Sequence, residues 1–215
     1  MAGHKLLLVG GGGHCRSVLD CVLRSGQYSA VGIVERAGTP KNDVLGVPVV
    51  GTDEDLPQLY AQGWDCAAVT LGSVGAPTHR RRLYELLKKL GFVLPVIADP
   101  SAVVSPFAKI AEGTFIAKEA VINAGAAIGA CTIINTAAVV EHDCQVGAFC
   151  HISPGATLCG GVCVEEDSHV GAASVVIQGI HIGRNAIVGA GTAVIRDVPE
   201  QCTVVGVPGR ILERK

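Results

Sequence analysis

The most reactive residues that the sequence places side by side are a histidine and two acids, Glu141-His142-Asp143. Histidine has an ordinary pKa near neutrality, so its imidazole can accept a proton from an attacking amine or hydroxyl group. A neighbouring carboxylate can fix the tautomer of the ring and stabilise the imidazolium that forms. The triplet predicts a general base at His142, with Asp143 or Glu141 as its partner. A solvated histidine beside two acids is the alternative, and the triplet alone does not decide between them.

A second candidate site is the glycine run Gly10 to Gly13, which follows an apolar stretch and precedes His14. Glycines at the start of a helix expose backbone N–H groups that can bind a phosphate or carboxylate. The dinucleotide pattern G-x-G-x-x-G is incomplete because Cys15 occupies the third glycine position, and Glu35 alone is weak evidence for a ribose contact. We therefore expect an anion or nucleotide site here rather than an NAD site. A purely structural loop is the alternative.

These residues depend on a repeat for their placement. Between residues 104 and 194 an aliphatic residue occurs at every sixth position without exception. A period of six fits neither an α-helix nor a coiled coil, but it fits a short strand followed by a tight corner. The positions two before each aliphatic residue are mostly small, and glycine often follows it. We expect three hexads to close one triangular coil of a narrow parallel β-helix. The sixteen aliphatic residues are Val104, Ile110, Ile116, Ile122, Ile128, Ile134, Val140, Val146, Ile152, Leu158, Val164, Val170, Val176, Ile182, Val188 and Val194.

The register also sorts the histidines. His142 comes two residues after an aliphatic position, which is a corner of the coil. His151 and His169 each precede an aliphatic residue, so they point outward, and their separation of eighteen residues stacks them one coil apart. Stacked histidines suggest zinc, but a third ligand at suitable spacing is not evident. We expect no metal.

The first hundred residues alternate between strand and helix patterns, which predicts a small Rossmann-like parallel α/β sheet. We place an N-terminal domain at residues 1–98, the β-helix at 99–200 and a C-terminal tail at 201–215. Within the first domain the expected strands are residues 5–9, 30–34, 66–71 and 92–97, and the expected helices are 14–24, 53–62 and 77–90.

Composition excludes several classes of protein. The net charge is −2 and the pI about 6.4, so no basic surface is available for nucleic acid. Nine cysteines without a C-x-x-C pair fit neither a disulfide framework nor a zinc ribbon. No apolar run is long enough to insert in a membrane or to serve as a signal peptide, which predicts a cytoplasmic protein. Few charges and flat prism faces also predict association into a homotrimer.

Three motifs carry a resemblance that covers essentially the whole chain. They are Gly-Gly-Gly-Gly-His at 10–14, Asn135-Thr136 leading into Val-Glu-His-Asp at 140–143, and Gly-Val-Pro-Gly-Arg at 206–210. Together they resemble the bacterial hexapeptide-repeat sugar acyltransferases, typified by sialic acid O-acetyltransferases and the UDP-4-amino-sugar N-acetyltransferases of the bacillosamine pathway. The resemblance implies a left-handed β-helix and acetyl transfer from acetyl-CoA to an amino or hydroxyl group of a nucleotide-linked sugar.

The same resemblance implies roles for particular residues. His142 would be the catalytic base with Asp143 as partner, although close relatives carry glutamate at that position. His151 would lie near the acetyl group or the pantetheine arm of CoA. The spacing of eighteen residues between Ala172 and Ala190 independently places both at one coil corner, where their backbone N–H groups could contact the CoA arm. The α/β domain would hold a UDP- or GDP-amino sugar near Gly12, Gly13, His14, Glu35, Arg36 and Gly72. The acceptor, the choice between N- and O-acylation and the acyl length stay open, as does a non-catalytic scaffold that keeps the fold.

Overall fold

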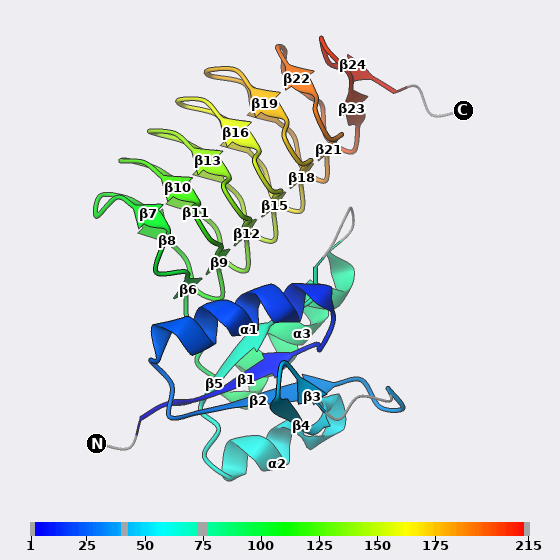
Figure 1. Ribbon diagram of the computed structural model, residues 1–215. Coiled ribbons are helices and arrows are strands. Elements are labelled where there is room, and N and C mark those ends of the chain that lie inside the picture. Colours follow the sequence, from blue (N-terminus) through cyan, green and yellow to red (C-terminus); the bar gives the residue numbers. More distant parts are fainter. Residues whose placement is uncertain (1–2, 40–42, 73–76, 213–215) are drawn as a thin grey trace.

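The computed structural model describes residues 3–39, 43–72 and 77–212, which form an α/β domain followed by a β-helix (Figure 1). The α/β sheet has the strand order β3-β4-β2-β1-β5 and is parallel except for the β3–β4 pair. Its elements are β1 (Lys5–Val9), α1 (Gly13–Ser25), β2 (Ala30–Glu35), β3 (Asp43–Val44), β4 (Val47–Thr52), η1 (Asp53–Asp55), α2 (Leu56–Ala61), β5 (Cys66–Val69) and α3 (Thr78–Leu90).

The central strand β1 is buried on both sides because helices cover both faces of the sheet, as its unbroken apolar run requires. Leu6 and Leu8 pack with α1, whereas Leu7 and Val9 pack with α2 and α3. The Rossmann-like sheet expected from the sequence is confirmed.

Two details of the predicted α/β domain are wrong. The short antiparallel pair β3–β4 was not predicted. The strand expected at residues 92–97 does not form as one element: Val93 makes a single bridge to Cys66, and Ile97 belongs to a later strand of the β-helix. Pro95 lies between them and has no N–H to donate to a ladder. Phe92 and Leu94 are nevertheless buried, so their apolar side chains pack in the core without strand pairing.

The second part is a parallel β-helix of three sheets, which we call faces 1, 2 and 3. Face 1 contains β6 (Ile97–Ala98), β9 (Phe115–Ile116), β12 (Ile133–Ile134), β15 (His151–Ile152), β18 (His169–Val170), β21 (Ile187–Val188), β23 (Thr203–Val205) and β24 (Arg210–Ile211). Face 2 contains β7 (Val103–Val104), β10 (Val121–Ile122), β13 (Val139–Val140), β16 (Thr157–Leu158), β19 (Val175–Val176) and β22 (Ala193–Val194). Face 3 contains β8 (Lys109–Ile110), β11 (Ala127–Ile128), β14 (Gln145–Val146), β17 (Cys163–Val164) and β20 (His181–Ile182).

Each coil visits the three faces in turn, and strands eighteen residues apart pair in parallel. The predicted aliphatic residues all face the interior; those from Ile116 onward are at most 4% exposed, while Val104 and Ile110 close the first coil and are partly buried. The expected architecture is confirmed. Glycines after the aliphatic position allow the backbones of neighbouring coils to approach closely. A Cβ on Gly129 or Gly147 would lie only 2.5 Å from a backbone nitrogen of the next coil.

Helix α1 lies between the α/β sheet and face 1 (Figure 1). The outward side chains of Phe115 and Ile133 on face 1 join the apolar core around α1. At the edges, Arg24 of α1 donates two hydrogen bonds to Asp99, at 3.0 and 3.1 Å, and Arg81 of α3 pairs with Asp167 at 2.6 Å. Both contacts tie the two parts together, and the α/β domain covers the part of face 1 that carries Phe115 and Ile133.

Three strands outside the expected range 99–200 also belong to face 1. Strand β6 pairs with β9 and begins face 1. Strand β23 pairs with β21 and extends face 1 beyond residue 200, and β24 then adds an antiparallel strand. The motif Gly-Val-Pro-Gly-Arg forms the turn that joins these last two strands.

Replacing an interior aliphatic residue should destabilise the whole β-helix, because neighbouring coils cannot collapse into the space it leaves. Ile122 on β10 is fully buried. We expect Ile122→Ala to lower the free energy of unfolding by about 2–5 kcal/mol in chemical denaturation. The control is Leu23→Ala on the outer surface of α1, where the side chain is 50% exposed. It should change the unfolding free energy by less than about 0.5 kcal/mol; equal losses for the two variants would contradict the interior assignment.

Candidate active site

His142 lies at the corner between faces 2 and 3, in a turn that it forms with Asp143. Its Nδ1 is 2.9 Å from Oδ2 of Asp143. Glu141 instead accepts a hydrogen bond from the backbone N–H of His142, with an N···O distance of 3.3 Å. A carboxylate can only accept, so Nδ1 carries the proton and Nε2 is the atom left to take one. The geometry pairs His142 with Asp143 despite the shorter side chain of aspartate.

Asp143 occupies the left-handed backbone region with a φ of 60°. At the same corner of the neighbouring coils this position is Gly125, Gly161 or Gly179, each also with positive φ. Left-handed backbone is unfavourable for most residues with a side chain, but aspartate tolerates it better than most. The turn therefore places a carboxylate beside the imidazole at a corner position that is glycine in both adjacent coils.

The electrostatics of the pair suit a base that is ready to accept a proton. The hydrogen bond to Asp143 raises the pKa of His142, and the negative charges of Asp143 and Glu141 act in the same direction. The His142 side chain is 62% exposed, so Nε2 is accessible to a ligand. A raised pKa increases the basicity of the ring.

A second group of functional side chains lies where the α/β domain meets face 1. His14, in the first turn of α1, packs its ring edge-on against Phe115 with centroids 5.4 Å apart. Burial, together with the nearby charges of His151 and Arg80, lowers the pKa of His14 to about 4. His14 is therefore neutral at physiological pH and can exchange hydrogen bonds without adding a charge.

His151 belongs to the same group. Asn135 accepts a hydrogen bond from the Thr136 N–H through Oδ1, at 2.8 Å, which leaves its Nδ2 facing Nε2 of His151 at 3.0 Å. Since an amide nitrogen only donates, Nε2 of His151 is an acceptor and its proton is on Nδ1. His169 stacks edge-on against His151, with ring centroids 5.0 Å apart.

His169 is the residue of this group that the sequence did not assign to the site. Its side chain points outward from face 1, as the register predicts, but it is only 7% exposed. Nε2 lies 3.3 Å from the Ser153 hydroxyl oxygen, and Nδ1 has no hydrogen-bond partner within the described residues. Burial lowers the pKa of His169, so it too is neutral. Its spacing of eighteen residues from His151 is the sequence feature that could have placed His169 in this group.

The glycine loop lies at the carboxyl end of β1, where α1 begins. Gly12 and Gly13 are exposed, and a Cβ on either would meet open space, so a ligand can approach their backbone. Glu35 follows at the end of β2 and accepts from Gly11 N and Arg36 N, both at 3.0 Å. Gly72 lies beside His14, since a Cβ at Gly72 would be 3.4 Å from that of His14. The structure thus gathers Gly12, Gly13, His14, Glu35, Arg36 and Gly72 at the carboxyl edge of this sheet, with His14 adjoining face 1.

Ala172 and Ala190 lie at the corner between faces 1 and 2, one coil apart. Within residues 77–212, neither backbone N–H donates to another group, whereas the following residues, Ala173 and Gly191, donate to the previous coil. The two amides are thus available to a ligand that lies along the coils, on the side of the prism that also carries His151.

His142 does not join these groups within one subunit. It lies at the corner between faces 2 and 3, which is opposite face 1 in a three-sided coil, and the α/β domain packs on face 1. The predicted site residues therefore form two clusters: the base with its carboxylate, and the neutral histidines with the glycine loop.

Within the described residues, the structure brings no third metal-binding side chain to the stacked histidines. Across the three described ranges, the one group of three closely spaced metal-binding side chains is His4, Asp65 and Cys66, at the amino edge of the α/β sheet. His151 and His169 do not belong to such a group. Nε2 of His151 is directed to Asn135, and Nε2 of His169 is directed to Ser153.

Comparison with known proteins agrees with both parts of this architecture. Residues 5–87 match the family model of the PglD N-terminal domain, and residues 161–196 match the hexapeptide repeat of succinyl-transferase. A solved structure of perosamine N-acetyltransferase from Caulobacter crescentus, a histidine-to-asparagine mutant in complex with CoA and GDP-perosamine, is 40% identical, with a TM-score of 0.91 and coverage of 98% of this chain and 97% of that one. The chain belongs to the bacterial sugar acyltransferases of the hexapeptide-repeat family.

Two further structures agree. The acetyltransferase domain of PglB from Neisseria gonorrhoeae FA1090, in complex with acetyl coenzyme A, is 37% identical, with a TM-score of 0.90, covering 98% of this chain and all of that one. WeeI from Acinetobacter baumannii AYE is 26% identical, with a TM-score of 0.84, covering 97% and 100% of the two chains. Comparison with curated proteins gave no match. The family confirms the predicted fold class, an α/β domain followed by a left-handed β-helix, and the predicted enzyme class.

None of the helices in the described ranges has the length and apolar character that a membrane span requires.

The His142–Asp143 pair should control the acid side of the pH profile. A base must be deprotonated, so activity should rise with pH through the pKa of His142, which Asp143 holds above the ordinary value of about 6.5. We expect Asp143→Asn to move this limb of kcat/KM to lower pH and to lower activity at neutral pH less than loss of the histidine does. Glu141→Gln is the matched control, and its shift should be smaller because that carboxylate bonds the backbone. An unmoved limb in Asp143→Asn would contradict the pairing.

Proposed function

We propose that this protein transfers the acetyl group of acetyl-CoA to an amino group on the sugar of a nucleotide-linked sugar. The observation that carries the proposal is the His142–Asp143 pair, with Nδ1 bound to the carboxylate and Nε2 free to accept a proton. The similar perosamine enzyme is an N-acetyltransferase bound to CoA and GDP-perosamine, and the similar PglB domain binds acetyl coenzyme A. Two mutants of the perosamine enzyme replace a histidine, which fits an essential imidazole in this family.

In the proposed reaction the neutral sugar amine attacks the thioester carbonyl of acetyl-CoA and forms the C–N bond. Nε2 of His142 takes the proton that the amine nitrogen loses, and the Asp143 carboxylate stabilises the resulting imidazolium. The C–S bond then breaks, and the imidazolium returns the proton to the leaving sulfur. The products are the N-acetyl sugar nucleotide and CoA thiol, and the base is regenerated.

The second cluster would bind the substrates. His14, Glu35, Arg36, Gly72 and the amides of Gly12 and Gly13 would hold the nucleotide-linked sugar, since they lie at the carboxyl edge of a parallel sheet, where such folds bind nucleotides. His151 and the amides of Ala172 and Ala190 would contact the CoA arm. The β-helix repeat has no insertion that could enclose an acceptor, so the α/β domain must supply that surface.

We also propose that the protein acts in the cytoplasm. Acetyl-CoA and nucleotide sugars are cytoplasmic metabolites. All nine cysteines are free thiols, as expected for a reducing compartment.

The base should be tested with thiol release from acetyl-CoA, using GDP-perosamine and UDP-linked amino sugars as acceptors. We expect His142→Ala to lower kcat by about 10²- to 10⁴-fold because proton removal loses its catalyst. The affinity for acetyl-CoA should be nearly unchanged. Near-wild-type turnover by His142→Ala would show that His142 is the wrong residue. Acetyl transfer only to a sugar hydroxyl would favour the O-acetyltransferase alternative, and no transfer to any acceptor would favour a scaffold.

We propose that the working enzyme is a homotrimer in which one subunit supplies His142 and its neighbour supplies the α/β domain. The two clusters lie on opposite sides of the coil, as described above, so a single subunit does not bring them together. Faces 2 and 3 remain uncovered in the subunit. The outward row of face 2 is largely aliphatic, including Val103 and Val175, which are 63% and 43% exposed.

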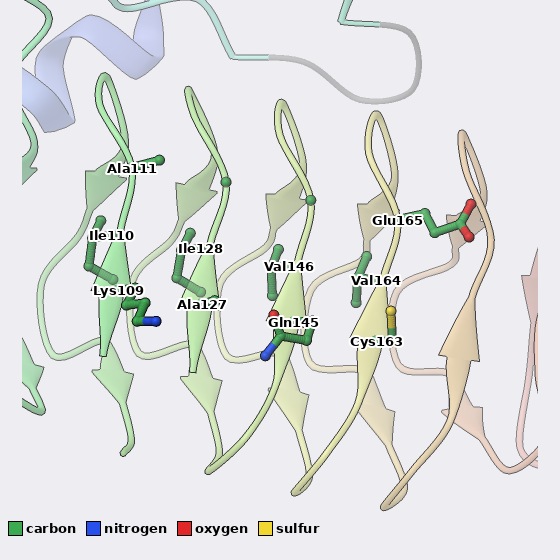
Figure 2. A pocket seen from close by; sticks show the side chains of 12 residues that line it. Lys109, Ile110, Ala111, Ala127, Ile128, Gln145, Val146, Cys163, Val164 and Glu165 are labelled. Atoms are coloured by element: carbon green, nitrogen blue, oxygen red, sulfur yellow. The ribbon is translucent and has the colours of Figure 1, made fainter. Parts of the chain in front are cut away.

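Face 3 offers a complementary surface. A shallow groove of about 520 Å³ crosses β8, β11, β14 and β17 (Figure 2). Small residues such as Ala127, Gly129 and Gly147 line it, while Lys109 and Glu165 provide charge near its ends. The apolar outward row of face 2 and the shallow groove of small residues on face 3 are both suited to packing against a second β-helix.

Mixing inactive subunits tests this arrangement. We expect His142→Ala and His14→Ala to be impaired when each is pure. After equal mixing through reversible dissociation, about a quarter of the sites should combine both wild-type residues if each site is shared between subunits. Regained activity together with a trimeric mass in light scattering would support the proposal. A stable monomer, or no regain from subunits shown to have mixed, would contradict it.

A further inference from the structure

We propose that Gly160 is a positioning residue for His142. Because glycine has no side chain, it leaves room in the next coil for the imidazole ring of His142 to take its working orientation. The inference rests on the proposed role of His142 as the base. Gly160 lies eighteen residues after His142, at the same corner between faces 2 and 3. The stacking of the two turns is fixed by the hydrogen bond from Gly161 N to the carbonyl of His142, at 2.9 Å.

The turn itself does not require glycine at this position. Ala124, His142 and Gln178 occupy the equivalent position in neighbouring coils, and all three carry side chains on an exposed corner. The φ of Gly160 is outside the left-handed region, unlike that of Gly161. Gly160 is also buried where those three residues are exposed. Its burial follows from the His142 ring, which lies against it.

A side chain at residue 160 would collide with the reactive end of the ring. A Cβ built on Gly160 would lie 2.6 Å from both Cε1 and Nε2 of His142, and 3.3 Å from Cδ2. Such contacts are too short, so the ring would have to move. Nδ1 is held by Asp143 at 2.9 Å, and a displaced ring would strain or break that bond. Even one methyl group at residue 160 therefore acts on both the position of Nε2 and its basicity.

The Asp143 carboxylate also lies against a glycine, in the coil before it. A Cβ on Gly125, one coil before Asp143, would lie 2.4 Å from Oδ1 of Asp143. Gly125 also has a φ of 78°, so its backbone needs glycine for a second reason. Gly160 is the cleaner test because only the ring depends on its missing side chain.

The test compares Gly160→Ala with Gln178→Ala, a change at the same corner one coil further on. Misplacing a catalytic group by about 1 Å costs about 10²-fold in rate. We expect Gly160→Ala to lower kcat by at least about 10-fold while its melting temperature stays close to that of the wild type. NMR titration of the free enzyme, with the His142 signal assigned by its loss in His142→Ala, should show the pKa of His142 falling toward its ordinary value. Gln178→Ala should leave both kcat and the pKa unchanged.

Two outcomes would overturn the inference. One is wild-type kcat and an unchanged His142 titration in Gly160→Ala while His142→Ala is inactive; the proposed function would then stand without this role for Gly160. The other is a loss of kcat with an unchanged His142 titration, which would place the effect on a substrate rather than on the base. Turnover by His142→Ala itself would instead contradict the proposed base.

Discussion

The pairing of each coil with the coil eighteen residues away is the interaction on which the rest of this structure depends. Buried aliphatic side chains such as Ile122, Val140 and Leu158 stack in columns inside the prism, and backbone hydrogen bonds join each coil to the next. Because the repeat has no insertion, every corner residue has a fixed neighbour in the next coil. The position of His142 beside Asp143 and over Gly160 is a direct consequence. A one-residue change of register would move each of these side chains to a different place.

The two clusters of functional histidines differ in their electrostatic environment. His142 is exposed beside a carboxylate that raises its pKa, so it gains and loses a proton readily. His14 packs where α1 meets face 1, His169 is buried on face 1, and desolvation lowers the pKa values of both. Neutral rings can donate and accept hydrogen bonds beside a ligand without bringing a charge into an apolar interface. In the proposed enzyme, proton transfer and substrate recognition are thereby assigned to different clusters of one scaffold.

The domain interface explains why the outward positions of face 1 differ from those of the other faces. Phe115 and Ile133 pack under α1, and the next outward residues along the same face are His151 and His169. The apolar pair anchors the α/β domain, and the polar pair continues from it toward the coil corner that carries Ala172. Docking of the α/β domain thus covers the apolar pair, and the polar pair lies next to it on the same face.

The sequence by itself determined the β-helix, because a period of six constrains the side-chain direction of every residue from 104 to 194 and tolerates no other regular structure. It also placed His142 at a corner beside Asp143 and put His151 and His169 on one face, since those relations follow from register alone. Contacts between residues far apart in the chain needed the tertiary structure. The choice of Asp143 over Glu141 depends on a left-handed turn, and the neutrality of His14 and His169 depends on their burial in the folded chain. The role of Gly160 depends on the space beside one imidazole ring. Pro95 similarly interrupts a strand that the apolar pattern alone favoured. Periodicity fixes which way a side chain points, whereas burial and clearance are set by what packs against it.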